Sequence, residues 1–246
     1  MIKKIRVMTA IYKNIHLPVS EAKSVRGFFA DLDYGDSCLH NHREDGQEIY
    51  RYPLVQYKVV GGHPVVVAIE EGIRSIHPHL MEQTQMTLGG RTYTDMALDI
   101  RLSELPLGDS RETREYQFAA PWLALNQKNF EKYKRAGRED REAILSNILI
   151  GNILSMCKGL GVTIENRVTV AHQLEWIPVW YKGKRMEGFK GSFQVNCCIP
   201  DLCGIGKGTA RGFGTVKYKQ IKGEMTDGMQ RSRICRVDYQ YKQVLR

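Results

Sequence analysis

The sequence predicts an α+β fold in which two βαββαβ units follow one another, the second of them a variant, with a glycine-rich loop near the C-terminus. Three observations lead to this fold class. Strand-like and helix-like patterns of apolar residues alternate through the first half. A charged, turn-rich segment over residues 103–114 marks a boundary between two domains, residues 1–108 and 115–246. The second half contains two helical patterns and then long β-rich runs.

The first strand and the first helix follow from the spacing of apolar side chains. Alternate residues from Ile5 to Ile11 have the pattern of a strand that is buried on one face. Ser20 is the expected N-cap of the helix that follows. The apolar residues of this helix recur at helical spacing: Ala22, Val25, Phe29 and Leu32.

Four more elements complete the first half. Two β-rich runs, 49–60 and 65–69, are joined by a turn over residues 61–64. A helix that contains Pro78 is predicted over residues 73–83, and alternating apolar residues from Met96 to Leu102 predict the fourth strand. The resulting order of strand, helix, strand, strand, helix, strand is that of a ferredoxin-like (RRM-like) unit.

The second half has a less regular pattern. It opens on an apolar run, Phe118–Leu125. Asn126 is the expected cap of a helix over residues 127–136, and a longer helix follows over residues 139–158. Two β-rich runs then precede the glycine-rich loop, over residues 168–181 and 189–199. These elements predict a variant of the ferredoxin-like unit, not a regular repeat of the first half.

The net charge favours a polyanionic partner. The chain of 246 residues contains 36 Lys and Arg against 27 Asp and Glu, a formal net charge of +9, and nucleic acid is the commonest partner of such a protein. No apolar run is long enough to cross a bilayer, and residues 1–4 lead into a strand pattern rather than a signal peptide. We therefore expect a cytoplasmic protein that does not act at a membrane.

The cysteines do not have the spacing of a metal site. Cys197, Cys198 and Cys203 form a C-C-x₄-C cluster, whereas zinc sites commonly use C-x₂-C pairs. Adjacent residues on a strand also point to opposite faces. We expect buried free thiols here, with no metal and no cofactor.

The glycine-rich loop runs from Gly204 to Gly214 and is the most informative segment. Glycine adopts positive φ at no steric cost and lets backbone N–H groups approach a ligand, and this loop also carries two cations. These features predict a loop that contacts RNA. The candidate RNA-binding residues are Gly204, Gly206, Lys207, Gly208, Arg211, Gly212 and Gly214.

Three nucleotide-binding patterns do not fit this loop. A Walker loop requires Ser or Thr after its lysine, but Gly208 follows Lys207. A dinucleotide fingerprint opens a helix, whereas a β-type run follows here. Residues 211–218 resemble the RNP1 signature of RNA-recognition motifs, except that Thr215 replaces an aromatic residue that would stack on a base.

The spacing of Gly204-Ile205-Gly206 and Gly212-Phe213-Gly214 resembles the C-terminal glycine-rich loop of the RAMP superfamily, especially its CRISPR-associated precursor-RNA-processing endoribonucleases. The resemblance implies two ferredoxin-like halves and histidine catalysis. It also implies an endonuclease that cuts CRISPR repeat RNA and so produces guide RNAs for antiviral defence. CRISPR effector complex subunits are further partners that it implies, while the oligomeric state stays open.

His40 and His42 are the candidate catalytic residues. Two histidines at this spacing in a loop can converge on one group, and histidine titrates near neutral pH. One imidazole would remove the 2′-OH proton of RNA and the other would protonate the departing 5′ oxygen, giving a 2′,3′-cyclic phosphate and a 5′-OH end without a metal. The resemblance supports this site, because the general base of these enzymes is often a histidine at or just after the first helix, and some members of the type I-B branch use two nearby histidines. Lys23 and Tyr34 are weaker candidates.

Two alternatives remain open from the sequence: a non-catalytic RNA-binding subunit and, more distantly, an RNA-recognition protein of unrelated role. His40 and His42 could be ordinary loop residues. The chain would then be a non-catalytic RAMP-type RNA-binding subunit of a CRISPR effector complex, with the same loop and the same charge.

Overall fold

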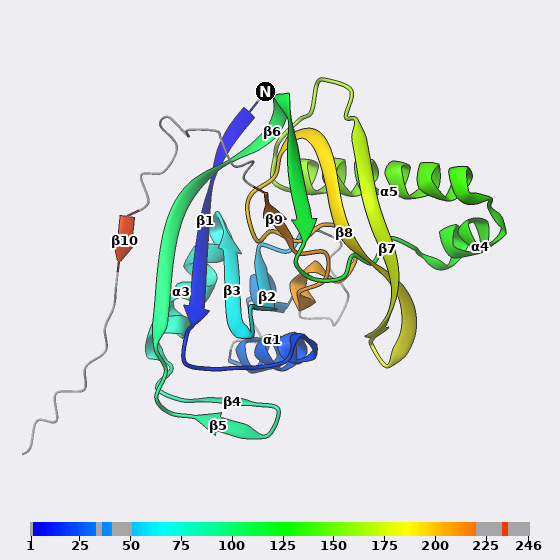
Figure 1. Ribbon diagram of the computed structural model, residues 1–246. Coiled ribbons are helices and arrows are strands. Elements are labelled where there is room, and N and C mark those ends of the chain that lie inside the picture. The colour runs from blue at the N-terminus through cyan, green and yellow to red at the C-terminus, as the bar shows by residue number, and fades with distance from the viewer. Residues whose placement is uncertain (1, 33–35, 41–50, 220–232, 236–246) are drawn as a thin grey trace, which may run out of the picture.

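The computed structural model describes residues 2–32, 36–40, 51–219 and 233–235 (Figure 1). Its main feature is an antiparallel sheet in which six strands have the order β2-β3-β1-β6-β8-β7, while β9 and β10 pair with β6. The strands of this sheet are β1 (Ile2–Tyr12), β2 (Val55–Val60), β3 (His63–Ile69), β6 (Leu98–Phe118), β7 (Val170–Tyr181), β8 (Lys184–Cys198), β9 (Val216–Tyr218) and β10 (Arg233–Cys235).

The helices alternate with these strands along the chain. They are α1 (Ala22–Ala30), α2 (Ser37–His40), α3 (Glu71–Glu82), α4 (Gln127–Arg135) and α5 (Arg138–Gly159), with single 3₁₀ turns at η1 (Val19–Glu21) and η2 (Thr209–Arg211). No helix within the described ranges is both long and apolar enough to span a membrane.

The first half forms the predicted ferredoxin-like unit. Its four strands lie in the order β6-β1-β3-β2, with every neighbouring pair antiparallel. Helices α1 and α3 cover one face through a core that includes Val25, Phe29, Ile76 and Leu80. The alternation in β1 predicted one buried face, and Ile5 and Val7 on that face join the core of the second half. The opposite face is buried as well, because Met8, Ala10 and Tyr12 pack in the core under α1 and α3.

The second half is the predicted variant. Its strands lie in the order β9-β6-β8-β7, which repeats the order of the first half. Strand β6 belongs to both halves, since it pairs with β1 over residues 98–108 and with β8 from Gly108 onward (Figure 1). Helix α5 takes the place of the first helix and buries Leu149 and Ile153. The glycine-rich loop occupies the chain position of the second helix, between β8 and β9.

Several local predictions need correction. Segment 103–114 is part of β6 rather than a turn-rich linker, because its backbone pairs with β1 and β8, with a register shift between Asp109 and Arg114. The division into domains 1–108 and 115–246 stays a prediction. Ser20 lies within η1, and the N-cap of α1 is Glu21. A hairpin of β4 (Met86–Leu88) and β5 (Arg91–Tyr93) was not predicted. Asn126 caps α4 as predicted, since its side chain accepts the Asn129 N–H at 2.8 Å.

Candidate nucleic-acid interface

The glycine-rich loop docks on both halves of the protein. Gly206 has φ +85°, and a Cβ at this position would lie 2.6 Å from Asn152 Oδ1 and 2.7 Å from Trp122 Nε1 in the second half. Gly212 has φ +86°, and its Cβ would lie 3.1 Å from the Tyr57 carbonyl oxygen in the first half. A side chain at either position would push the loop away from its seat. The glycines therefore let the loop bridge the two halves.

Several backbone N–H groups of the loop donate hydrogen bonds inside the protein. The Gly204 N–H donates to Gln56 Oε1 at 2.9 Å, and the Gly214 N–H donates to the Pro121 carbonyl at 2.8 Å. The Gly212 N–H donates to the Thr209 carbonyl at 3.1 Å. RNA contact through these three N–H groups would require these bonds to break. The predicted RNA contact therefore depends most on the side chains of Lys207, which is exposed, and Arg211, which is half-buried.

A buried lysine joins β2 to this loop. Lys58 is only 1% exposed, and its Nζ donates to Gln56 Oε1 at 2.9 Å and to Thr215 Oγ1 at 3.1 Å. Gln56 in turn holds Gly204, at the start of the loop, while Thr215 follows its end. Burial lowers the pKa of Lys58 to about 7. This network was not predicted from the sequence, although two polar residues within an apolar β-rich run were a signal for it.

The stability of the protein should depend on the titration of Lys58. The unfolded lysine titrates near 10.4, so the unfolded chain binds more protons than the folded chain between about pH 7 and that value. The Lys58 contribution to the free energy of unfolding therefore rises with pH in this window, by at most about 1.4 kcal/mol per unit. Urea unfolding of wild type and Lys58→Met from pH 6.5 to 9.5 measures this contribution as the difference between their slopes.

An exposed lysine provides the control for Lys58→Met. Lys217→Met on β9 should keep the wild-type pH dependence, because Lys217 is exposed. Equal slopes for Lys58→Met and wild type would show that Lys58 is charged throughout this pH window.

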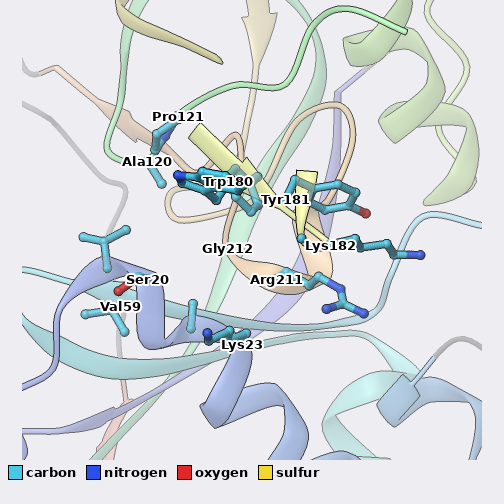
Figure 2. A pocket seen from close by; sticks show the side chains of 14 residues that line it. Ser20, Lys23, Val59, Ala120, Pro121, Trp180, Tyr181, Lys182, Arg211 and Gly212 are labelled. Carbon is cyan, nitrogen blue, oxygen red and sulfur yellow. The ribbon is translucent and has the colours of Figure 1, made fainter. Parts of the chain in front are cut away.

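A pocket with basic walls lies beside the loop. It has a volume of about 310 Å³ and is bounded by η1 and α1, the β7–β8 turn and η2. Figure 2 shows Trp180 and Tyr181 on one side, with Ser20 and Lys23 facing them. Three of its residues are basic, Lys23, Lys182 and Arg211, and no acidic residue lines it within the described part of the chain. Such a pocket suits a phosphate-bearing ligand.

Positive charges gather around this pocket. Burial lowers the pKa of the Arg26 guanidinium on α1, and the nearby charge of Arg211 lowers it further. The Lys207 ammonium lies 5.3 Å from the centroid of the Tyr181 ring, which packs edge-on against Phe213 at 5.5 Å. The positive charges of Arg26 and Arg211 repel one another, so an anion bound beside them would relieve the repulsion.

Helix α2 packs on Tyr57, the residue that also lies against the glycine-rich loop. Leu39 is buried, and its carbonyl accepts a hydrogen bond from the Tyr57 hydroxyl at 3.4 Å. The Tyr57 backbone lies against Gly212, so α2 and the glycine-rich loop both pack on this one residue. His40 is the last residue of α2, one position beyond Leu39. The His40 side chain and the whole of His42 lie outside the described residues, as does Tyr34, and their catalytic roles stay predictions.

The three clustered cysteines are buried free thiols, as the sequence predicts. Cys197, Cys198 and Cys203 are all buried, and burial raises the pKa of Cys203 to about 12. Its thiol is therefore protonated at neutral pH and unreactive. Over the described ranges, no three His, Cys, Asp or Glu side chains form a group that could hold a metal ion.

Two ferredoxin-like units that share a strand, with a glycine-rich loop seated across both, define this chain as a protein of the RAMP type. The chain belongs to the Cas6b family. The model of the Cas6b N-terminal domain matches residues 3–105, and that of the Cas6b C-terminal domain matches residues 108–219.

Two solved structures agree with this assignment, and the chain is also similar to one uncharacterized protein. A crystal structure of Cas6b is 35% identical, with a TM-score of 0.85 over 88% of this chain and 100% of that one. A crystal structure described as CRISPR RNA processing endoribonuclease Cas6b is 33% identical, with a TM-score of 0.73 and the same coverage. An uncharacterized protein of Methanocaldococcus jannaschii is 36% identical over 133 residues, which are 54% of this chain and 90% of that protein.

Proposed function

We propose that this protein is an endoribonuclease that processes CRISPR RNA by cutting it within the repeats. The observation that carries the proposal is its likeness to the solved CRISPR RNA processing endoribonuclease Cas6b over the full length of that structure. The pocket lined by Lys23, Lys182 and Arg211 supports a polyanionic substrate.

We further propose that the reaction uses the 2′-OH of RNA and needs no metal. One of His40 and His42 accepts the 2′-OH proton as the O2′–P bond forms, and the other donates a proton to the 5′ oxygen as the P–O5′ bond breaks. The products are a 2′,3′-cyclic phosphate and a 5′-OH end. Lys207 and Arg211 of the loop supply positive charge that would stabilise the negative charge on the phosphate.

The first test is cleavage of a labelled repeat RNA in EDTA, with the RNA taken from the CRISPR array of the genome that encodes the chain. We expect cleavage at one position at an unchanged rate, because no step uses a metal. The same RNA with a single 2′-deoxy nucleotide before the scissile phosphate should stay intact, because its nucleophile is absent.

The outcomes of this test separate the remaining alternatives. Loss of cleavage in EDTA would contradict the metal-independent reaction, and cleavage of the 2′-deoxy RNA would contradict attack by the 2′-OH. Tight binding without cleavage of either RNA would favour the alternative of a non-catalytic RAMP-type RNA-binding subunit.

A further inference from the structure

Trp180 is an exposed aromatic residue at the edge of the basic pocket. Its side chain is 73% exposed, which is more than that of any other large apolar residue in the described part of the chain. It shares the exposed face of β7 with Trp176, which is 47% exposed and does not line the pocket. Tryptophan is highly buried on average, so a ring this exposed points to a binding role.

The backbone that carries Trp180 is held in place on both sides. Trp180 pairs with Arg185 across the β7–β8 hairpin, whose two-residue turn has φ +49° at Lys182 and +75° at Gly183. Positive φ at both central residues is the geometry of a tight hairpin turn. The neighbouring Tyr181 packs on Phe213 of the glycine-rich loop. The indole of Trp180 is therefore presented to solvent from a fixed backbone, which lowers the entropy cost of binding a ligand.

Three basic residues line the same pocket as this ring. Lys182 follows it in the hairpin turn, Arg211 lies in η2, and Lys23 faces it from α1 (Figure 2). The pocket volume of about 310 Å³ lies at the lower end of the range for small-ligand sites. An aromatic platform next to positive charge is the arrangement that binds unpaired nucleotides, because every base can stack and every phosphate is an anion.

We propose that this pocket binds one unpaired nucleotide of the RNA substrate, with its base stacked on Trp180 and its phosphate held by Lys23 and Arg211. The proposal rests on the proposed function and adds a base-binding subsite to it. Stacking does not distinguish strongly between bases, so the subsite adds affinity and register without selecting one base.

The test measures the binding of a fluorescein-labelled repeat RNA to wild type, Trp180→Ala, Trp180→Phe and Trp176→Ala. We expect Trp180→Ala to raise the Kd by roughly 5- to 150-fold, the range of base–aromatic stacking. Trp180→Phe should restore most of the affinity, and Trp176→Ala should bind like wild type. Because Trp180 is exposed, its variants should melt at the wild-type temperature, which a thermal scan checks.

A series of RNAs that each lack one base locates the nucleotide. We expect one abasic position to weaken binding by wild type but not by Trp180→Ala, because the stacked pair is already lost in the variant. Equal affinity of wild type and Trp180→Ala for the intact RNA would overturn the subsite. An equal loss in Trp176→Ala would also overturn it, since the whole β7 face would then bind RNA.

Cleavage of the same RNA separates this proposal from the proposed function. If wild type cleaves the RNA and Trp180→Ala binds it unchanged, only the subsite is wrong. If wild type binds with the expected dependence on Trp180 but does not cleave, the subsite stands and the nuclease proposal fails.

Discussion

Replacing His40 or His42 with alanine is expected to lower the cleavage rate of repeat RNA by roughly 10²–10⁴-fold, the usual contribution of a general acid or base. RNA affinity should change little, because we expect the phosphates to be bound by other residues, the cations of the loop and the pocket. Single-turnover cleavage at saturating protein measures the chemical step apart from binding. The double variant should be less impaired than the product of the two single effects, since both groups act in one step.

An exposed histidine away from this region provides the control. His77 lies on α3 and is exposed, so His77→Ala should cleave at the wild-type rate. If His40→Ala and His42→Ala also cleave at that rate, neither histidine transfers a proton in the reaction.

The first half was predicted well because its signals are local. Helical and alternating patterns placed β1, α1, α3 and β3 within a few residues of their observed positions. The conformation of segment 103–114 was predicted wrongly, because its sequence contains the charges and turn formers of a loop, while its strand conformation depends on pairing with β1 and β8. Pairing partners that are distant in sequence leave no local signal.

In the candidate site too, the features with local sequence signals were predicted and those that depend on distant neighbours were missed. The glycine-rich loop was found from spacing alone, because positive φ and close packing demand glycine at fixed positions. Lys58 and Trp180 were missed because their importance depends on neighbours from other elements. Lys23 was only a weak candidate in the sequence, and the packing of α1 beside η2 brings it to the pocket.

A glycine-to-alanine substitution in the glycine-rich loop should also cause a large loss of stability. Gly214 has φ +63°, and a Cβ there would lie 1.9 Å from the Ile205 carbonyl oxygen, which is backbone and cannot rotate away. The Ile205 N–H donates to the Gly214 carbonyl at 2.9 Å, so the loop closes on itself at this point. We expect Gly214→Ala to lower the free energy of unfolding by about 3 kcal/mol or more, since it combines a left-handed conformation with a backbone clash.

Alanine substitutions at two other glycines provide a ranked comparison of stability. In Gly212→Ala the added Cβ would lie 3.1 Å from the Tyr57 carbonyl oxygen, so the loss of stability should be smaller than in Gly214→Ala. Gly151→Ala on α5 meets no atom within 4 Å and should stabilise the protein by roughly 0.5–1 kcal/mol, because alanine favours the helix. Urea unfolding of the three variants measures this order. If Gly214→Ala unfolds at the same urea concentration as Gly151→Ala, the loop is not closed as described.

The loop also carries Lys207 and Arg211, so the folded fraction of Gly214→Ala should bind repeat RNA more weakly than Gly151→Ala does, which links the glycine spacing to RNA binding.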